Sequence, residues 1–363
     1  MNSKPAVRFD ALTGFRCLAA CLVFFYHNRK YWRDFLHPEI LRLFNEFHIG
    51  VSLFFVLSGF LIAYTYAEEP LKSAKSYAKY FSVRFVRIMP LYWLILTAYY
   101  LDPAFGNMHF SWLTYLLFHG FSDQHNLDAI AQAWSLNIEM TFYALAPLLC
   151  LLQKKHLVYL LGFLALLFLG TWAIGYYWHQ VNGNPHKWLY PLHFVLSGTF
   201  PGRCLEFVVG MMLANYIRSN KTEFIQKFRF KTIIGFAGIF ISTYCIGLFQ
   251  SKTSSHGSDQ PEGMTLQLLA LPVFVAIALA GLIYEKSWLQ KFFSSRVMVL
   301  LGNASFAFYL IHISYVNLKV REWFLLPDRN FVVLWLISII LYLVFEKPIY
   351  DGYRKRIKKP AKT

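Results

Sequence analysis

The sequence predicts an all-α protein, a polytopic bundle of about ten transmembrane helices with both termini in the cytoplasm. Of the 363 residues, 57% are hydrophobic and only 15% are charged, whereas a soluble domain has about 25% charged residues. The apolar residues form long continuous runs, not the short alternating segments of a membrane β-barrel. The Lys and Arg residues gather in alternate loops, as they do on the cytoplasmic side of a membrane.

Ten apolar runs approach the length of about 20 residues that crosses a bilayer. We expect spans near residues 11–28, 47–67, 86–101, 133–152, 157–178, 195–217, 232–250, 265–284, 298–318 and 331–349. The third run is short, which leaves open a start within 77–85. Residues 110–121 are too short to span and are expected to form an interfacial or re-entrant helix. We treat residues 1–363 as a single transmembrane domain with a short basic cytoplasmic tail at 350–363.

The positive charge of the chain follows from this topology. Most of the 35 Lys and Arg residues lie in segments assigned to the cytoplasm, and the outward stretch 101–133 has none. The formal net charge of +16 therefore reflects the distribution that orients membrane proteins. We expect no nucleic-acid partner, and we expect membrane lipids as partners, with anionic lipid contacting the basic tail. The cysteines are expected to be small buried hydrophobes; they are Cys17, Cys21, Cys150, Cys204 and Cys245.

The first predicted helix carries two titratable side chains, Arg16 and His27, inside an apolar run. A spacing of eleven residues is about three helical turns, so both side chains project from nearly the same face, about 16 Å apart along the axis. Ionisable groups at membrane depth are costly and are usually functional. For either residue alone, a structural explanation stays open, in which Arg16 reaches the inner headgroups and His27 ends the helix.

The fourth span opens with Trp134–Glu139 and places the carboxylate of Glu139 at about the depth of His27. A buried carboxylate needs a partner, and a nearby imidazole would be oriented and made more basic by it. An equally open interpretation is that Glu139 pairs with an arginine such as Arg203 for structure alone. Arg203 is three residues before Glu206, so these two are also able to pair with each other.

Arg84 and Arg87 lie at the expected cytoplasmic mouth of the third helix and share one helix face. Paired guanidinium groups suit phosphate oxygens. On these residues alone, ordinary flanking by positive charge is the simpler explanation.

Two further stretches combine small or polar residues with apolar surroundings. Gly50–Phe60 contains Ser58, but no nucleophile-elbow sequence surrounds this serine, so we expect the stretch to serve close helix packing. The ninth run contains Tyr309 and, one turn further, His312. A single histidine in an apolar helix is usually a satisfied structural group, and the nearby Tyr309 favours a polar cluster.

These stretches follow the order of a known family. The chain resembles the acyltransferase-3 group of integral membrane O-acyltransferases in the segments LTGFRCLAACLVFFYH, GVSLFFVLSGFLI, YFSVRFVRIMPLYWL, WSLNIEMTFYALAPLL, RCLEFVVG, LGNASFAFYLIH and FEKP. The segments run from residue 12 to 348, essentially the whole chain. Each is weakly specific alone, and the set is highly specific. Phe15 and Cys17 depart from the usual residues around Arg16 without changing the matched positions.

The resemblance implies an enzyme. Family members typically move an acyl group, most often acetyl, from cytoplasmic acyl-CoA to a carbohydrate hydroxyl. Arg16 and His27 match the essential pair of the family, and Arg84 and Arg87 match its second arginine motif. The expected enzyme is an acetyl-CoA-dependent, metal-free O-acyltransferase of the bacterial inner (cytoplasmic) membrane. It resembles the stand-alone members, so its expected acceptor is a surface glycan such as lipopolysaccharide O-antigen.

The expected mechanism begins with the phosphates of acyl-CoA on Arg84, Arg87 and Lys79. His27 then acts as general base on the sugar hydroxyl, oriented by Glu139. Arg16 is a candidate for stabilising the oxyanion, and an acyl group held transiently on His27 is the open alternative. The acceptor side is expected to include Trp134, Tyr143, Arg203, Tyr309 and His312.

Two other functions compete with this one. A lipid or glycan transporter or flippase would also carry buried charges along its pathway, although the sequence shows no inverted repeat and no pair of broken helices. A structural scaffold leaves Arg16, His27 and Glu139 unexplained. The sequence leaves open the position acylated and the oligomeric state.

Overall fold

The computed structural model describes residues 9–66, 73–102, 111–219, 228–251, 254, 256–323 and 327–358. Within these ranges the chain forms helices and no β-strand, which confirms the all-α prediction for them. The chain divides into two compact units, each made from two separate stretches. The first unit contains residues 1–57 and 216–306, and the second contains residues 58–215 and 307–363.

The first unit is organised around α1 (Asp10–Asn28), which contacts α2, η2, α13 and α14. Asp10 lies in the first turn of α1, where a carboxylate complements the helix dipole. The other elements of this unit are η1 (Arg29–Trp32), α2 (Pro38–Asn45), η2 (Phe47–Ile49), the first half of α3 (Gly50–Tyr66), α11 (Lys231–Gly247), η6 (Gly257–Asp259), α12 (Pro261–Thr265), η7 (Leu266–Ala270), α13 (Leu271–Tyr284), α14 (Trp288–Phe293) and most of α15 (Arg296–Ile311).

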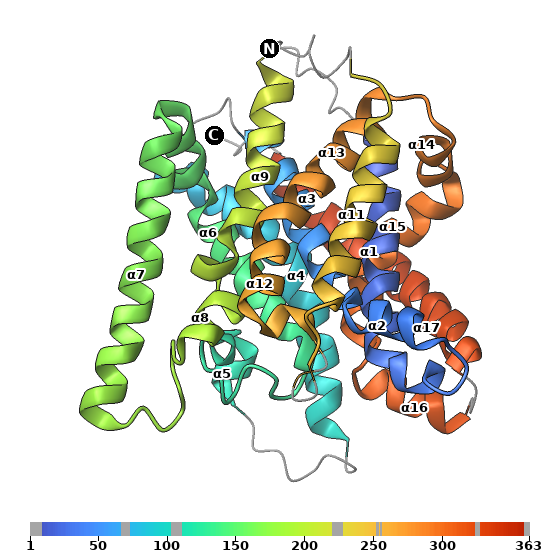
Figure 1. Ribbon diagram of the computed structural model, residues 1–363, viewed down its shortest axis with the longest axis horizontal. Helices are drawn as coiled ribbons and strands as arrows, with labels where there is room; N and C mark the ends of the chain where they lie inside the picture. The colour runs from blue at the N-terminus through green and yellow to red at the C-terminus, as the bar shows by residue number, and fades with distance from the viewer. Residues whose placement is uncertain are drawn as a thin grey trace. The chain divides into compact units, whose positions relative to one another are not determined.

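Within the first unit, α11 and α13 run side by side (Figure 1). Small residues allow this approach, since a Cβ on Gly235 of α11 would lie 2.3 Å from the Ala278 nitrogen of α13. Glu285, just after α13, caps the start of α11 by accepting from the backbone N–H groups of Lys231 (2.7 Å) and Thr232 (2.9 Å). Burial raises the pKa of Glu285, but these hydrogen bonds outweigh it and leave the pKa below its usual value.

The second unit contains the longest apolar helices. Its elements are the second half of α3, α4 (Ala74–Leu101), α5 (Trp112–Tyr115), η4 (Phe118–Phe121), η5 (Ala131–Ala133), α6 (Trp134–Lys155), α7 (Leu157–Asn182), α8 (Leu192–Gly198), most of α9 (Phe200–Arg218), the end of α15, α16 (Tyr315–Trp323), α17 (Pro327–Leu341), η8 (Tyr342–Glu346) and α18 (Lys347–Lys358). Only 11% of the most apolar window of α7, the long green helix of Figure 1, is buried. The remaining surface of α7 is therefore apolar and suited to lipid.

Six helices in the described part of the chain are long and apolar enough to cross a membrane. They span Pro38–Tyr66, Ala74–Leu101, Ala131–Lys155, Leu157–Asn182, Pro261–Tyr284 and Asn330–Ile357, and α15 with α16 forms a bent seventh. The protein is therefore a multi-pass membrane protein. The predicted first span forms the helix α1, but α1 is not among these six helices. Its polar residues, Arg16 and His27 among them, lower its mean hydropathy. Ten spans and two cytoplasmic termini stay predictions.

The ninth predicted span, 298–318, is not one continuous helix. α15 ends at Ile311, α16 begins at Tyr315, and the two helices are bent by 88°. At the break, Ser314 Oγ donates to the Ile311 carbonyl (3.1 Å), and Asn317 Nδ2 donates to the His312 carbonyl. These side chains occupy carbonyls that a continuing helix would bond through its own backbone.

Two other boundaries refine the prediction. α4 starts at Ala74, earlier than the range 77–85 left open for it, because Ser73 caps the helix by accepting from the Ser76 N–H (3.2 Å). The run 195–217 is divided at Thr199 between α8 and α9. Residues 111–121 form only the short turns α5 and η4, with Trp112 exposed.

Candidate functional site

The first helix of the chain, α1, carries Arg16 and His27 without interruption, as predicted. Arg16 Nε lies 3.4 Å from Ser305 Oγ of α15 as a hydrogen-bond donor, and its guanidinium is 5.9 Å from the centre of the Phe54 ring of α3. Both contacts are within the first unit. Arg16 is therefore held by a hydroxyl and an aromatic face in the segments LGNASFAF and GVSLFF.

Close backbone approaches fix the position of α1 in its unit. A Cβ on Gly302 would lie 1.8 Å from the Thr13 carbonyl oxygen, and a Cβ on Gly50 would lie 2.4 Å from the Ala19 carbonyl oxygen. Only glycine fits at such distances. The packing role expected for the stretch that begins at Gly50 is confirmed at this residue.

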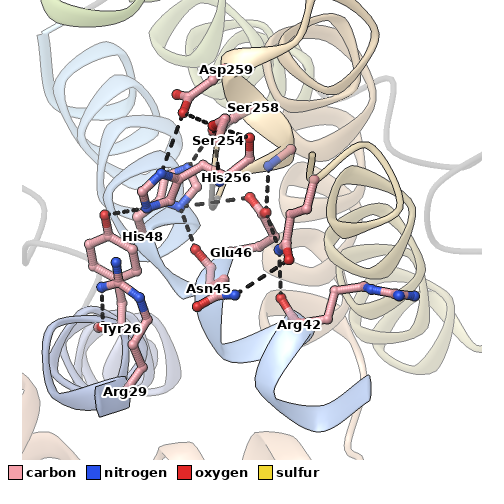
Figure 2. Close-up of polar contacts among 12 residues, drawn as sticks. Tyr26, Arg29, Arg42, Asn45, Glu46, His48, Ser254, His256, Ser258 and Asp259 are labelled. Carbon is pink, nitrogen blue, oxygen red and sulfur yellow. Dashed lines mark hydrogen bonds and ion pairs between the residues drawn. The ribbon is translucent and has the colours of Figure 1, made fainter. Parts of the chain in front are cut away.

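The end of α1 that carries Tyr26 joins a polar group that the sequence did not reveal (Figure 2). The Tyr26 ring lies 4.6 Å from the His27 ring, and Tyr26 Oη forms a 2.7 Å hydrogen bond with His256 Nε2. The other ring nitrogen of His256 is 3.4 Å from Asp259 Oδ2. The Arg29 guanidinium lies 4.5 Å from the centre of the Tyr26 ring.

We call this group, with Glu46, His48 and Ser258, the histidine cluster. The hydrogen bond from His256 holds the pKa of Asp259 below its usual value. Asp259 is thus set to stay ionised and to orient the imidazole of His256. Among the described residues, no group of three or more His, Cys, Asp or Glu is placed to hold a metal ion.

In the second unit, Glu139 of α6 accepts two hydrogen bonds on the same oxygen, Oε1. Ser58 Oγ donates at 2.7 Å and Tyr143 Oη donates at 2.5 Å. Hydroxyl donors of this kind stabilise a carboxylate in an apolar setting. Glu139 therefore has hydroxyl partners in its own unit, and its partnership with His27 stays a prediction.

Tyr143 connects Glu139 to the predicted donor-binding arginine. The guanidinium of Arg84 lies 5.9 Å from the centre of the Tyr143 ring and 5.4 Å from that of Tyr66, and Arg84 Nη2 donates to Tyr66 Oη (3.4 Å). Arg87, one turn along α4, is 5.8 Å from the Tyr350 ring. Both guanidinium groups thus rest against aromatic faces. Lys79 is exposed on the same helix, and the stacking of Tyr143 on a sugar stays a prediction.

Arg203 and Glu206 form the pair that their spacing predicts. Arg203 Nε and Nη2 donate to the two oxygens of Glu206 at 2.6 and 2.8 Å, and both side chains are almost fully buried. Trp134 covers the pair, with its ring centre 6.0 Å from the guanidinium. A two-point arrangement of this kind is the strong form of an arginine–carboxylate bond.

Tyr309 and His312 lie in a second polar group of the same unit. Tyr309 Oη shares a 2.7 Å hydrogen bond with Ser135 Oγ, and Gln132 Nε2 donates to the Tyr309 and Leu310 carbonyls at 3.1 and 2.6 Å. His312 is buried, with Nδ1 2.7 Å from the Tyr309 carbonyl. This is the polar cluster expected beside His312, and Gln132 is an addition that the sequence did not indicate.

Comparison with known proteins identifies the family. The model of the acyltransferase domain family matches residues 9–346. The chain belongs to this family. This acyltransferase is 25% identical over 332 residues to the peptidoglycan O-acetyltransferase OatA of Listeria monocytogenes, which covers 85% of this chain and 49% of the relative. It is 25% identical over 327 residues to the acyltransferase MdmB of Streptomyces mycarofaciens, covering 84% and 78% of the two chains.

A third relative is a putative O-acetyltransferase of Staphylococcus aureus, 24% identical over 364 residues, with 93% of this chain and 55% of the relative covered. The acyltransferase thus spans about half the length of the Listeria and Staphylococcus relatives. No solved structure matches it. Cys17, Cys150 and Cys204 are buried, as expected, whereas Cys21 and Cys245 are only partly buried.

Proposed function

We propose that this acyltransferase moves an acyl group, with acetyl as first candidate, from cytoplasmic acyl-CoA to a hydroxyl of a surface carbohydrate such as lipopolysaccharide O-antigen or another cell-envelope glycan. The family match supports acyl transfer. The names of the Listeria and Staphylococcus relatives favour acetyl as the group and oxygen as the acceptor atom, and the Listeria name favours an envelope glycan. We place the protein in the bacterial inner membrane.

The observation that carries the proposal is the geometry of α1. One continuous helix carries both Arg16 and His27. The guanidinium of Arg16 donates to a serine hydroxyl, and the imidazole of His27 lies near the other end of the helix. Their separation of about 16 Å along the axis suits a donor that enters from one side and an acceptor that enters from the other. A structural scaffold needs no imidazole at this place.

On the donor side, Arg84 and Arg87 bind the phosphates of acyl-CoA. They lie on one face of α4, and planar guanidinium groups pair with phosphate oxygens at two points. Lys79, exposed on the same helix, adds a third positive charge. Tyr143 lies between Arg84 and Glu139, so the donor site and the Glu139 carboxylate share one side chain.

In the transfer step, the sugar oxygen forms a bond to the thioester carbonyl carbon while His27 takes the hydroxyl proton. The thioester passes Arg16 to reach His27, about 16 Å further along α1, and polar donors at that end stabilise the negative charge that develops on the carbonyl oxygen. The carbon–sulfur bond then breaks, and CoA leaves as a thiol after it takes up a proton from His27. The alternative is a two-step route in which the acyl group rests transiently on His27.

The test uses the purified full chain in detergent with acetyl-CoA and envelope glycan. Transfer is measured as free CoA released and as acetyl ester on the glycan by mass spectrometry and NMR. His27→Ala should reduce transfer by roughly 10²–10⁴-fold, the usual contribution of a general base. His193→Ala, which alters an exposed histidine of α8, is the matched control and should transfer normally. Full activity in His27→Ala would sink the proposal.

A second pair of variants tests the donor site. Arg84→Ala should raise the KM for acetyl-CoA about tenfold or more, because a hydrogen bond to a charged group contributes about 1.5–3 kcal/mol. Arg296→Ala, which changes an exposed arginine at the start of α15, should leave the KM unchanged. Equal KM values in the wild type and Arg84→Ala would remove Arg84 from the donor site.

A further inference from the structure

The histidine cluster contains a second arrangement, formed by Ser258, His48 and Glu46 (Figure 2). Ser258 Oγ is 3.1 Å from His48 Nε2. The other ring nitrogen, Nδ1, is 3.4 Å from the Asn45 carbonyl oxygen and 3.9 Å from Glu46 Oε2. All four residues belong to the first unit. A serine hydroxyl bonded to an imidazole, with a carboxylate at ion-pair distance behind that imidazole, is similar to the arrangement that activates a serine nucleophile.

The surroundings of His48 determine which nitrogen carries the hydrogen. Both groups facing Nδ1, the Asn45 carbonyl and the Glu46 carboxylate, accept hydrogen bonds, so Nδ1 is the protonated nitrogen of the neutral ring. Nε2 is then an acceptor, and Ser258 donates its hydroxyl hydrogen to it. This is the tautomer in which an imidazole takes a proton from serine.

Glu46 holds the two halves of the arrangement together. Its side chain is fully buried, and Oε1 accepts from the Gly257 backbone N–H (2.7 Å) and from Gln250 Nε2 (2.6 Å). Oε2 has no hydrogen-bond partner in the described part of the chain, and it is the oxygen that faces His48. A buried carboxylate oxygen that accepts no hydrogen bond raises the free energy of the folded protein. A positive charge on His48 would offset this cost.

The loop that carries Ser258 is held closely. A Cβ on Gly257 would lie 1.7 Å from the Ile246 carbonyl oxygen, so the backbone next to Ser258 packs closely against the end of α11. Ser258 and His48 are both half-buried. A nucleophile needs this combination of a fixed position and an open face.

The arrangement adjoins the proposed acceptor base. The Tyr26 ring lies 4.6 Å from the His27 ring and 5.4 Å from the His48 ring. One aromatic side chain thus contacts both the imidazole that we assign to the sugar hydroxyl and the imidazole that bonds Ser258. An acyl group on Ser258 would lie near His27.

We propose that Ser258 is the acyl carrier of this acyltransferase, activated by His48 and Glu46; the proposal rests on the proposed acyl transfer and names its covalent intermediate. Ser258 Oγ forms an ester bond to the acyl carbon of acyl-CoA, His48 takes the serine proton, and the carbon–sulfur bond breaks. The proton passes to the CoA thiolate, which leaves as a thiol. The sugar hydroxyl then attacks the ester carbonyl carbon while His27 takes its proton. The bond between the acyl carbon and Ser258 Oγ breaks, and the proton passes from His27 to Ser258 Oγ, which restores both histidines.

The test is to trap the intermediate. The purified full chain is incubated with [1-14C]acetyl-CoA without glycan, quenched in acid and digested, and the labelled peptide is identified by mass spectrometry. We expect the label on Ser258 and free CoA released in the same amount. Ser258→Ala should abolish this label, and His48→Ala should slow labelling by roughly 10²–10⁴-fold. Ser251→Ala, a serine of the same loop, should label as the wild type does.

Ser258→Cys guards against a variant that fails to fold, because the acetyl group should then form a thioester that neutral hydroxylamine cleaves. Label on the His27 peptide, or wild-type transfer by Ser258→Ala, would overturn the carrier. If Ser258→Ala transfers normally while His27→Ala does not, only the carrier is refuted and the proposed function stands. If the wild type neither releases CoA nor acetylates glycan, the proposed function itself fails.

Discussion

The buried pair of Arg203 and Glu206 should be much more sensitive to loss of one charge than a matched pair at the surface. The two side chains are bonded at 2.6 and 2.8 Å with relative exposures of 5% and 0%. Removal of one partner from such a pair leaves a buried charge without compensation and costs about 3–5 kcal/mol. We therefore expect Glu206→Gln to lower the free energy of unfolding by that amount.

Glu39 and Arg42 provide the control within the same chain. They have the same spacing along a helix and a similar distance of 2.8 Å, but relative exposures of 45% and 36%. A pair screened by solvent contributes about 0–1 kcal/mol, so Glu39→Gln should be nearly neutral.

The assay is reversible unfolding in mixed detergent micelles, followed by loss of helical circular dichroism. The double variant Arg203→Met/Glu206→Leu should recover most of the stability lost in Glu206→Gln, because packed apolar residues often replace a buried ion pair at little cost. The reasoning is refuted if Glu206→Gln and Glu39→Gln differ by less than about 1 kcal/mol.

Three further changes test other parts of the structure. Gly302→Ala should lower the free energy of unfolding by about 1–3 kcal/mol, because its Cβ would lie 1.8 Å from a carbonyl oxygen of α1. Gly170→Ala is the control, because a Cβ there meets nothing within 4 Å, and it should be neutral or stabilising. Equal losses of stability in the two variants would contradict the close packing at Gly302. Glu285→Gln should reduce the loss of unfolding free energy that the wild type shows as the pH falls. The pKa of Glu285 is lower in the folded protein, so its contribution to stability is complete above the pKa of the unfolded chain and is lost as the pH falls through the folded-state pKa. If the variant and the wild type lose stability equally at acid pH, Glu285 does not act as the cap. Tyr143→Phe removes a hydrogen bond to Glu139 but keeps the aromatic ring next to the acyl-CoA site. The kcat should therefore fall while the KM for acetyl-CoA stays constant, and a raised KM would contradict the assignment.

Local patterns in the sequence were sufficient for the helices and for contacts between residues one turn apart. Long apolar runs predicted α6, α7 and α13 because a bilayer span needs only length and composition. The pair of Arg203 and Glu206 followed from the i, i+3 spacing, which places both side chains on one face. The bend after Ile311 was missed because the apolar run continues through it, while Ser314 and Asn317 divert the backbone bonds.

The histidine cluster was not predictable in the same way. Tyr26 and His256 are far apart in the sequence, as are His48 and Ser258, and no repeated spacing relates them. Their meeting depends on how α1, α2 and the loop before α12 pack in the first unit. Tyr143 is a different case, because it lies four residues after Glu139 on the same helix. That spacing alone indicates a contact between the two side chains, but we expected Tyr143 to bind the sugar instead.

The exposed, apolar surface of α7 has a consequence for how this chain tolerates change. A Cβ on Gly162 or Gly170 of α7 would meet nothing within 4 Å, and little of the most apolar window of this helix is buried. Lipid accepts any apolar side chain of ordinary size, so selection on α7 acts on length and average hydropathy. In a saturation mutagenesis library, α7 should accept most apolar substitutions, whereas α9, with its buried charges, should accept few.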